Sequence, residues 1–182
     1  MRCRIVLAAS LLGLVGLGLA PTPASAATRT AVIRLTVDGQ PRTYRLHGVT
    51  RSGPQALVIV LHGAGATAKE VERRYHWDPL ADREGFAVAY PQAILRRWDE
   101  TGTGDVDFLR TLITDVSART PIDPARVYVT GISNGGVMTY RAGCALAGTV
   151  AAIGPVAAWF PDCLPATAVS VIHIHGLEDH VL

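Results

Sequence analysis

The sequence feature that most constrains the fold is a Gly-x-Ser-x-Gly motif between an apolar run and a helix-forming segment. The run is Val127–Thr130, the motif occupies Gly131–Gly135, and the helix-competent segment extends from Gly136 to Leu146. A strand, a sharp turn and a helix in this order form a nucleophile elbow, which lifts a serine hydroxyl above a sheet. A bare motif also arises by chance in a glycine-rich chain, so it is the flanking elements that favour function. The motif predicts Ser133 as a nucleophile.

Apolar runs of strand length alternate with segments of helical period along the rest of the chain. The predicted strands are 31–37, 44–46, 56–61, 86–90, 127–130, 150–158 and 169–174, and the predicted helices are 67–74, 78–84, 105–118 and 136–146. Asp38-Gly39 is a hairpin signal between the first two strands. Largely apolar strands are typical of a mostly parallel sheet with helices on both faces, which predicts an α/β fold. Ligands of such sheets bind beyond the carboxyl ends of the strands, where Ser133 would lie.

The first 26 residues have the pattern of a secretory signal peptide. Arg2 and Arg4 precede an apolar run over 5–20, and Ala-Ser-Ala at 24–26 supplies the small residues of a cleavage site. The apolar run is shorter than a membrane-spanning helix and a cleavage site follows at once, which disfavours a membrane anchor. We therefore expect a secreted, extracellular protein whose single domain occupies residues 27–182.

Charge excludes one class of partner. The chain has 17 basic and 15 acidic side chains, and Arg2 and Arg4 lie in the leader, so the remainder has no net formal charge. A nucleic-acid partner would require a basic face, and none is indicated. The sequence leaves the oligomeric state open.

Two cysteines, Cys144 and Cys163, remain after the leader is removed. An even number of cysteines in an exported chain favours a disulfide, because the compartment is oxidising. Two buried free thiols, acting as small hydrophobic groups, are the alternative.

A His-Gly loop follows the buried strand at 56–61. In serine hydrolases of this architecture, such a loop supplies one backbone N–H of the oxyanion hole, and the residue after the nucleophile supplies the other. The second donor is then Asn134. Small residues suit the loop because the oxyanion must approach the main chain to about 2.7–3.1 Å. We assign the loop donor to Ala64, with Gly65 as the alternative, and interpret His62 as a structural residue.

A candidate acid follows the last predicted strand. That strand ends at His175-Gly176, and Asp179 lies in the loop beyond it. An acid placed there can orient a histidine and stabilise its imidazolium, and the order serine then acid fits the architecture. Glu178 is the competing acid, and a merely solvated loop residue is the remaining alternative.

Together these residues resemble the secreted polyhydroxybutyrate depolymerase-like esterases, which include feruloyl and acetylxylan esterase relatives. The matching stretches are 62–65, 105–109, 122–131, 133–138 and 173–179. The resemblance implies an α/β-hydrolase fold, ester hydrolysis through an acyl-enzyme at Ser133, Asp179 as the triad acid, and no metal or organic cofactor. Cys144 and Cys163 lie where relatives carry cysteines. The segment before Asp105 is shorter than in relatives, and it borders the pocket, so the resemblance does not specify which ester is cleaved. The expected substrate is a small-molecule or polymeric ester.

The triad histidine is the feature that the given sequence does not supply. It should come well downstream of the acid, and after Asp179 the sequence holds His180, Val181 and Leu182. The other histidines are His47, His62, His76, His173 and His175, and none is in a convincing context for a base. We expect a domain that is incomplete at its C-terminus and nearly inactive. A vestigial or binding protein, and a peptidase or lipase of the same fold, are the alternatives.

Overall fold

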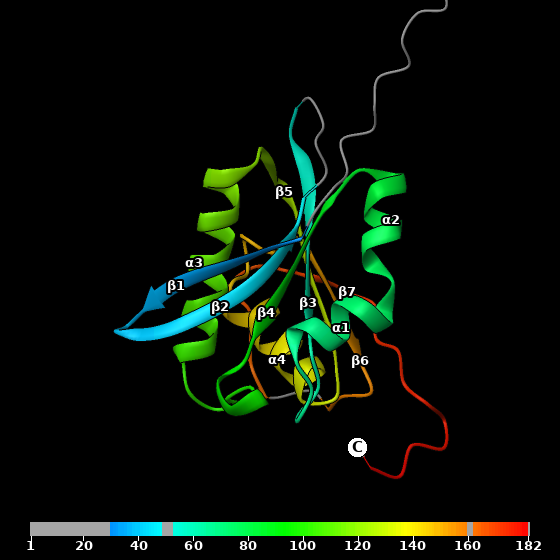
Figure 1. The fold of residues 1–182 in the computed structure, drawn as a ribbon. Helices are drawn as coiled ribbons and strands as arrows, with labels where there is room; N and C mark the ends of the chain where they lie inside the picture. The colour runs from blue at the N-terminus through cyan, green and yellow to red at the C-terminus, as the bar shows by residue number, and fades with distance from the viewer. Residues whose placement is uncertain (1–29, 49–52, 160–161, 182) are drawn as a thin grey trace, which may run out of the picture.

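A seven-stranded sheet organises the computed structural model, which describes residues 30–48, 53–159 and 162–181 (Figure 1). The strands are β1 (Ala31–Val37), β2 (Gln40–His47), β3 (Gln55–Leu61), β4 (Ala87–Gln92), β5 (Ile122–Ile132), β6 (Ala152–Val156) and β7 (Ser170–Val171). The helices are α1 (Ala68–Tyr75), α2 (Trp77–Glu84), α3 (Gly104–Arg119) and α4 (Asn134–Ala145), and a short 3-10 helix, η1, covers Ile94–Arg96.

The strand order is β1-β2-β4-β3-β5-β6-β7. Strands β1, β2 and β4 pair antiparallel, and the pairs from β4 through β7 are parallel. The first hairpin turns at Asp38 and Gly39, whose φ angles of 50° and 75° are those of the turn type that Asp-Gly favours. The predicted α/β fold with a mostly parallel sheet is therefore confirmed.

Strand β3 shows why its sequence is apolar throughout. Leu57, Ile59 and Leu61 belong to the larger hydrophobic cluster, beside α3 and α4, whereas Val58 and Val60 belong to the smaller cluster, beside α1 and α2. Side chains of a strand alternate between the two faces of its sheet. Figure 1 shows these two helix pairs on opposite sides of the sheet.

The β7 end of the sheet is much less buried. Val171, Ile172 and Ile174 are 49%, 70% and 57% exposed. The strand predicted at 169–174 is a ladder of only two residues, Ser170–Val171, continued by single contacts such as the Ile174 amide to the Pro155 carbonyl at 3.0 Å. The sequence pattern overestimated this strand because apolar composition does not ensure regular pairing.

Helix and strand bounds elsewhere differ modestly from expectation. Helix α4 begins at Asn134, two residues earlier than predicted, and β5 begins at Ile122 instead of Val127. The predicted signal peptide lies outside the described residues. Within the described ranges, every helix is too short or too polar to cross a membrane.

Candidate active site

Ser133 lies at the junction of β5 and α4 in a strained backbone conformation. Its φ and ψ are 56° and −127°, a combination that a residue with a Cβ rarely adopts. Its amide donates to the Val156 carbonyl at 3.0 Å, and its carbonyl accepts from the Val137 amide at 2.9 Å. Strand pairing on one side and helix formation on the other therefore hold the turn.

The three elbow glycines are required by their surroundings. A Cβ on Gly131 would lie 2.5 Å from the Gly135 carbonyl oxygen, and one on Gly135 would lie 2.5 Å from the His62 carbonyl oxygen. A Cβ on Gly136 would lie 2.6 Å from the Ala158 Cβ. Backbone atoms cannot move aside cheaply, so larger residues would force the turn apart.

The His-Gly loop packs directly against the elbow. A Cβ built on Gly63 would lie 3.7 Å from the Ser133 Cβ. The Gly65 amide donates to the Arg96 carbonyl at 2.8 Å, so the alternative oxyanion donor is engaged. The Ala64 amide donates to none of the described residues, and Ala64 is exposed. This arrangement favours Ala64 over Gly65 for the role, which stays a prediction.

His62 is a buried structural residue in this arrangement. Its Nε2 lies 3.1 Å from the Ala93 amide, which can only donate, so Nε2 is the acceptor. In the neutral ring Nδ1 then carries the hydrogen, and it donates to the Gly63 carbonyl at 2.8 Å. Burial lowers the pKa of His62. The neutral imidazole thus braces the His-Gly loop.

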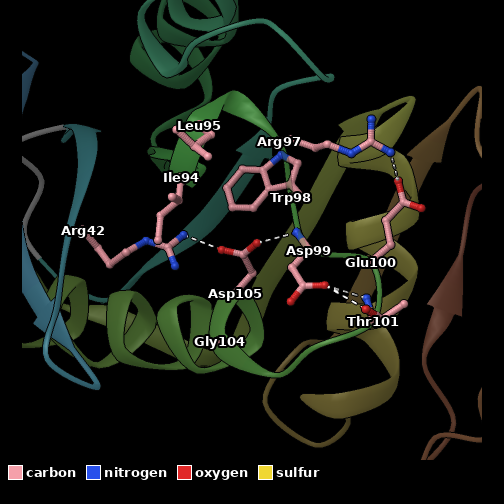
Figure 2. Close-up of a pocket in the computed structure, with 10 residues that line it drawn as sticks. All are labelled: Arg42, Ile94, Leu95, Arg97, Trp98, Asp99, Glu100, Thr101, Gly104 and Asp105. Carbon is pink, nitrogen blue, oxygen red and sulfur yellow. Dashed lines mark hydrogen bonds and ion pairs between the residues drawn. The ribbon is translucent and has the colours of Figure 1, made fainter.

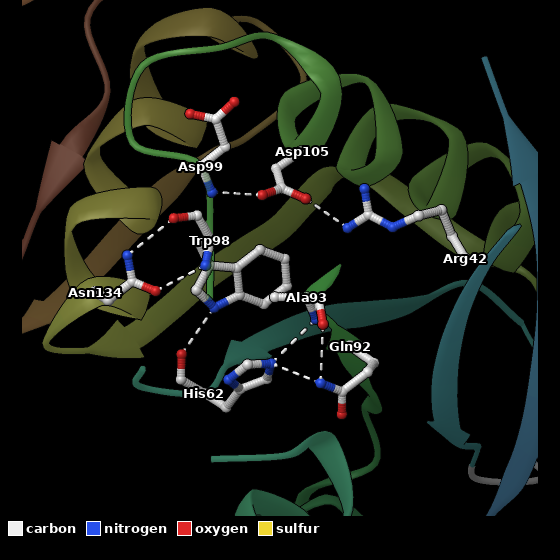
Figure 3. A network of polar contacts seen from close by, with 8 residues as sticks. All are labelled: Arg42, His62, Gln92, Ala93, Trp98, Asp99, Asp105 and Asn134. Carbon is white, nitrogen blue, oxygen red and sulfur yellow. Dashed lines mark hydrogen bonds and ion pairs between the residues drawn. The ribbon is translucent and has the colours of Figure 1, made fainter. Parts of the chain in front are cut away.

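Trp98 joins the oxyanion loop to the elbow (Figure 3). Its indole N–H donates to the His62 carbonyl at 2.7 Å. The Asn134 side chain binds both backbone groups of Trp98: Oδ1 accepts from its amide at 2.8 Å, and Nδ2 donates to its carbonyl at 3.0 Å. Nδ2 also donates to Oε1 of Glu100 at 2.7 Å. Asn134, which follows Ser133, is therefore fixed by the segment that also braces the His-Gly loop.

A buried ion pair anchors this segment from behind. The Asp105 carboxylate accepts from the Asp99 amide at 2.7 Å and from the Arg42 guanidinium at 2.5 Å. The Arg42 and Asp105 side chains are only 4% and 6% exposed, and the guanidinium lies 3.9 Å above the Phe108 ring. Nothing in the local sequence signals this contact, because Arg42 is 63 residues from its partner.

An open cleft of about 580 Å³ lies beside the same segment (Figure 2). Its lining combines apolar Ile94 and Leu95 with Arg97, Asp99 and Glu100. Leu95 and Arg96 have left-handed φ angles of 50° and 59°, and Leu95 is 94% exposed. Trp98 lines the cleft and also binds Asn134, so the cleft adjoins the segment that contacts the elbow.

The candidate acid lies at the less buried end of the sheet. Oδ1 of Asp179 accepts from the Val181 amide at 2.9 Å, and Oδ2 lies 3.4 Å from Nε2 of His175. The Asp179 side chain is 19% exposed, whereas Glu178 is exposed. Asp179 is the better placed of the two acids, and its role remains a prediction.

Cys144 and Cys163 form a disulfide with a Cα–Cα distance of 6.3 Å. It ties the end of α4 to the segment that follows β6. Among the described residues, no three His, Cys, Asp or Glu side chains come close enough to hold a metal ion.

Comparison with known proteins identifies the family. Residues 48–160 match the family described as "Esterase PHB depolymerase". A bifunctional acetylxylan esterase/xylanase of Neocallimastix patriciarum is 32% identical over 79% of this chain and 22% of its own length. A putative esterase of Nocardia uniformis is 30% identical over 86% of this chain and 50% of its own. A poly(3-hydroxyalkanoate) depolymerase of Paucimonas lemoignei is 35% identical over 46% of this chain. The chain thus spans half or less of these relatives.

Solved structures support the fold. The acetyl xylan esterase of Aspergillus awamori superposes with a TM-score of 0.60 and 18% identity, covering 68% of this chain and 50% of that one. The S-formylglutathione hydrolase of Staphylococcus aureus superposes with a TM-score of 0.59 and 18% identity, covering 72% and 59%. At such identities the similarity establishes the fold only.

Proposed function

This chain belongs to the esterase PHB depolymerase family, and we propose that it is a secreted serine esterase that cleaves carboxylic esters through an acyl-enzyme at Ser133. The observation that carries the proposal is the elbow. Ser133 has the strained φ of 56° between β5 and α4, and the His-Gly loop packs against it. A serine held in this way can attack an acyl carbon while backbone amides bind the developing oxyanion.

In the proposed reaction, Oγ of Ser133 attacks the ester carbonyl and its proton passes to a histidine base. The carbonyl oxygen becomes an oxyanion, which the amides of Ala64 and Asn134 bind. The alcohol leaves with the proton from the imidazolium, and water then releases the acid from Ser133. Asp179 orients the histidine and stabilises its positive charge. No metal or organic cofactor is used.

The substrate class is an ester of the polyhydroxyalkanoate, feruloyl or acetyl type. The similar proteins have names that refer to acetylxylan, feruloyl and poly(3-hydroxyalkanoate) substrates. The test is a panel of an acetyl ester, a feruloyl ester, a 3-hydroxybutyrate oligomer, a long-chain lipid ester and a peptide amide. We expect ester cleavage that Ser133→Ala abolishes and Ser117→Ala, a change on α3, does not. Amide cleavage alone, or activity that survives Ser133→Ala, would refute the proposal.

The base is the weak point of the described site. His47, His62 and His173 bond to Asp82, Ala93 and Tyr140 respectively. We therefore predict that the 182-residue chain hydrolyses an activated acetyl ester very slowly, because loss of one triad member typically costs on the order of 10⁴ in turnover. His180→Ala serves as the control. Rapid turnover that this variant loses would make His180 the base.

Secretion and the disulfide form separate parts of the proposal. N-terminal sequencing of exported protein should begin at Ala27, and retention of Met1 would contradict the predicted cleavage. Intact mass before and after reduction and alkylation should reveal one bond between Cys144 and Cys163. Alkylation of both thiols in denatured, unreduced protein would contradict it.

A further inference from the structure

A row of three aromatic rings connects α4 to the loop that carries Asp179. The Tyr140 hydroxyl lies 2.6 Å from Nδ1 of His173, and Nε2 of His173 lies 3.1 Å from Nδ1 of His175. The row ends where Nε2 of His175 lies 3.4 Å from Oδ2 of Asp179. Neighbouring rings are nearly parallel, with centroid separations of 5.9 Å and 5.2 Å and interplanar angles of 28° and 13°.

The chemistry of these groups gives the row a direction. Nε2 of His175 lies within ion-pair distance of a carboxylate, which only accepts hydrogen, so we infer that Nε2 carries the hydrogen. In a neutral imidazole the other nitrogen is then the acceptor, and it receives the Nε2 hydrogen of His173. Nδ1 of His173 accepts in turn from the Tyr140 hydroxyl. Burial raises the pKa of Tyr140, which keeps its hydroxyl protonated as this arrangement requires. Both hydrogen bonds of the row therefore point toward His175, whose Nε2 faces Asp179.

We propose that Tyr140, His173 and His175 are positioning residues that hold the Asp179 carboxylate in register with α4, and hence with Ser133 at the start of that helix. The inference rests on the proposed function, in which Asp179 is the triad acid. Tyr140 is 8% exposed and is fixed by the core. The acid loop has little packing of its own, since Ile174 and Leu177 are 57% and 106% exposed. The row supplies the attachment that packing does not.

The same geometry separates positioning from base catalysis. Nδ1 of His175 faces His173, and its Nε2 faces Asp179. While the row is intact, this ring has no nitrogen with which to accept the Ser133 proton. His175 therefore acts through Asp179 and not on the substrate.

The test is ¹⁵N NMR of the histidine rings in the 182-residue chain, because nitrogen shifts distinguish the two neutral tautomers. We expect His173 and His175 both to be in the Nε2–H form. Asp179→Ala removes the final acceptor, and the row predicts that His173, which His175 separates from Asp179 in the row, loses its single tautomer together with His175. The exposed His76 is the internal control and should not change. A change confined to His175 would overturn the proposal.

Two further variants keep the proposal testable if Asp179→Ala unfolds. Tyr140→Phe retains the ring and removes only the hydroxyl, so His175, which lies beyond His173 in the row, should lose its single tautomer. His175→Gln retains an acceptor and a donor and should preserve the His173 tautomer, whereas His175→Leu should abolish it. The proposal would be overturned if the His175 tautomer were unchanged in Tyr140→Phe. It would also be overturned if His175→Gln and His175→Leu had equal effects on the His173 tautomer.

The histidine signals do not depend on turnover, so failure of this inference can be distinguished from failure of the proposed function. If the row does not exist, covalent labelling of Ser133 by a fluorophosphonate probe is unaffected. If Ser133 is not the nucleophile, labelling fails while the histidine signals remain as predicted.

Discussion

Gly135 in the elbow and Gly176 in the acid loop both belong to motifs that the sequence singles out, yet their surroundings differ. A Cβ on Gly135 would lie 2.5 Å and 2.8 Å from two backbone carbonyl oxygens, whereas one on Gly176 would lie 3.9 Å from its nearest neighbours. The apolar strands differ in the same way. Val127 and Val129 of β5 are each 1% exposed, whereas Val171 of β7 is 49% exposed.

The difference indicates that the two halves of the site are held by different interactions. Backbone shape and a buried polar network fix the elbow and its oxyanion loop. We propose that the contacts from Tyr140 through His173 and His175 hold the candidate acid, Asp179, at the poorly packed end of the sheet. Changes at the elbow end should therefore cost much more free energy of unfolding than matched changes at the acid end or on the surface.

The largest effect should come from breaking the ion pair behind Trp98. Asp105→Ala leaves the buried Arg42 guanidinium without its carboxylate, which typically costs about 3–5 kcal/mol. Asp107→Ala, in the same turn of α3, removes a pair whose side chains are 40% and 51% exposed and should cost under about 1 kcal/mol. Urea unfolding measures the loss of unfolding free energy in both variants. Equal losses would mean that burial of the ion pair does not determine its contribution to stability.

The glycine pair tests the comparison at the backbone. Gly135→Ala forces a Cβ against two carbonyl groups and should destabilise the chain by about 1–3 kcal/mol, as overpacking does. Gly176→Ala enters ordinary contact and should stay within about 0.5 kcal/mol of the parent. Thermal unfolding of the two variants provides the measurement. A Gly176→Ala variant as unstable as Gly135→Ala would refute the contrast between the two loops.

Trp98→Phe should have an effect of similar size, about 1–3 kcal/mol, because the His62 carbonyl loses its buried indole donor. Trp77→Phe controls for the smaller ring, since the Trp77 indole donates to none of the described residues. The difference in unfolding free energy between the two variants isolates the N–H. Indistinguishable variants would show that the Trp98 hydrogen bond does not brace the loop.

Several parts of this contrast follow from the sequence. The apolar runs of β3 and β5 predict strands buried on both faces, and Asp38-Gly39 predicts the first hairpin, because these signals are local. The Trp98–Asn134 and Arg42–Asp105 contacts could not be predicted, since they join residues 36 and 63 positions apart. The early start of α4 was also missed. Asn-Gly-Gly has low intrinsic helix propensity, and the packed elbow overrides it.

The smallest effect should be a pH dependence from His62. Burial lowers its pKa in the folded state, so above about pH 6.5 both folded and unfolded states hold it neutral. Below that value the unfolded chain binds a proton at His62 and the folded chain does not, so the free energy of unfolding decreases as the pH is lowered. The melting temperature should therefore drop less between pH 7.5 and 5.5 in His62→Gln than in the parent. His180→Gln, at the acid end, serves as the control, and an unchanged drop in His62→Gln would contradict this role.

The central claim is that the elbow and the His-Gly loop hold Ser133 as a nucleophile. The most direct measurement is the rate at which a fluorophosphonate labels the 182-residue chain, with the labelled peptide identified by mass spectrometry. Imidazole added to the buffer serves as an external base. We predict slow labelling confined to Ser133, a rate that rises with imidazole concentration, and no labelling of Ser133→Ala. Labelling of another residue, or a Ser133 that stays unlabelled in imidazole while the chain is folded, would contradict the account.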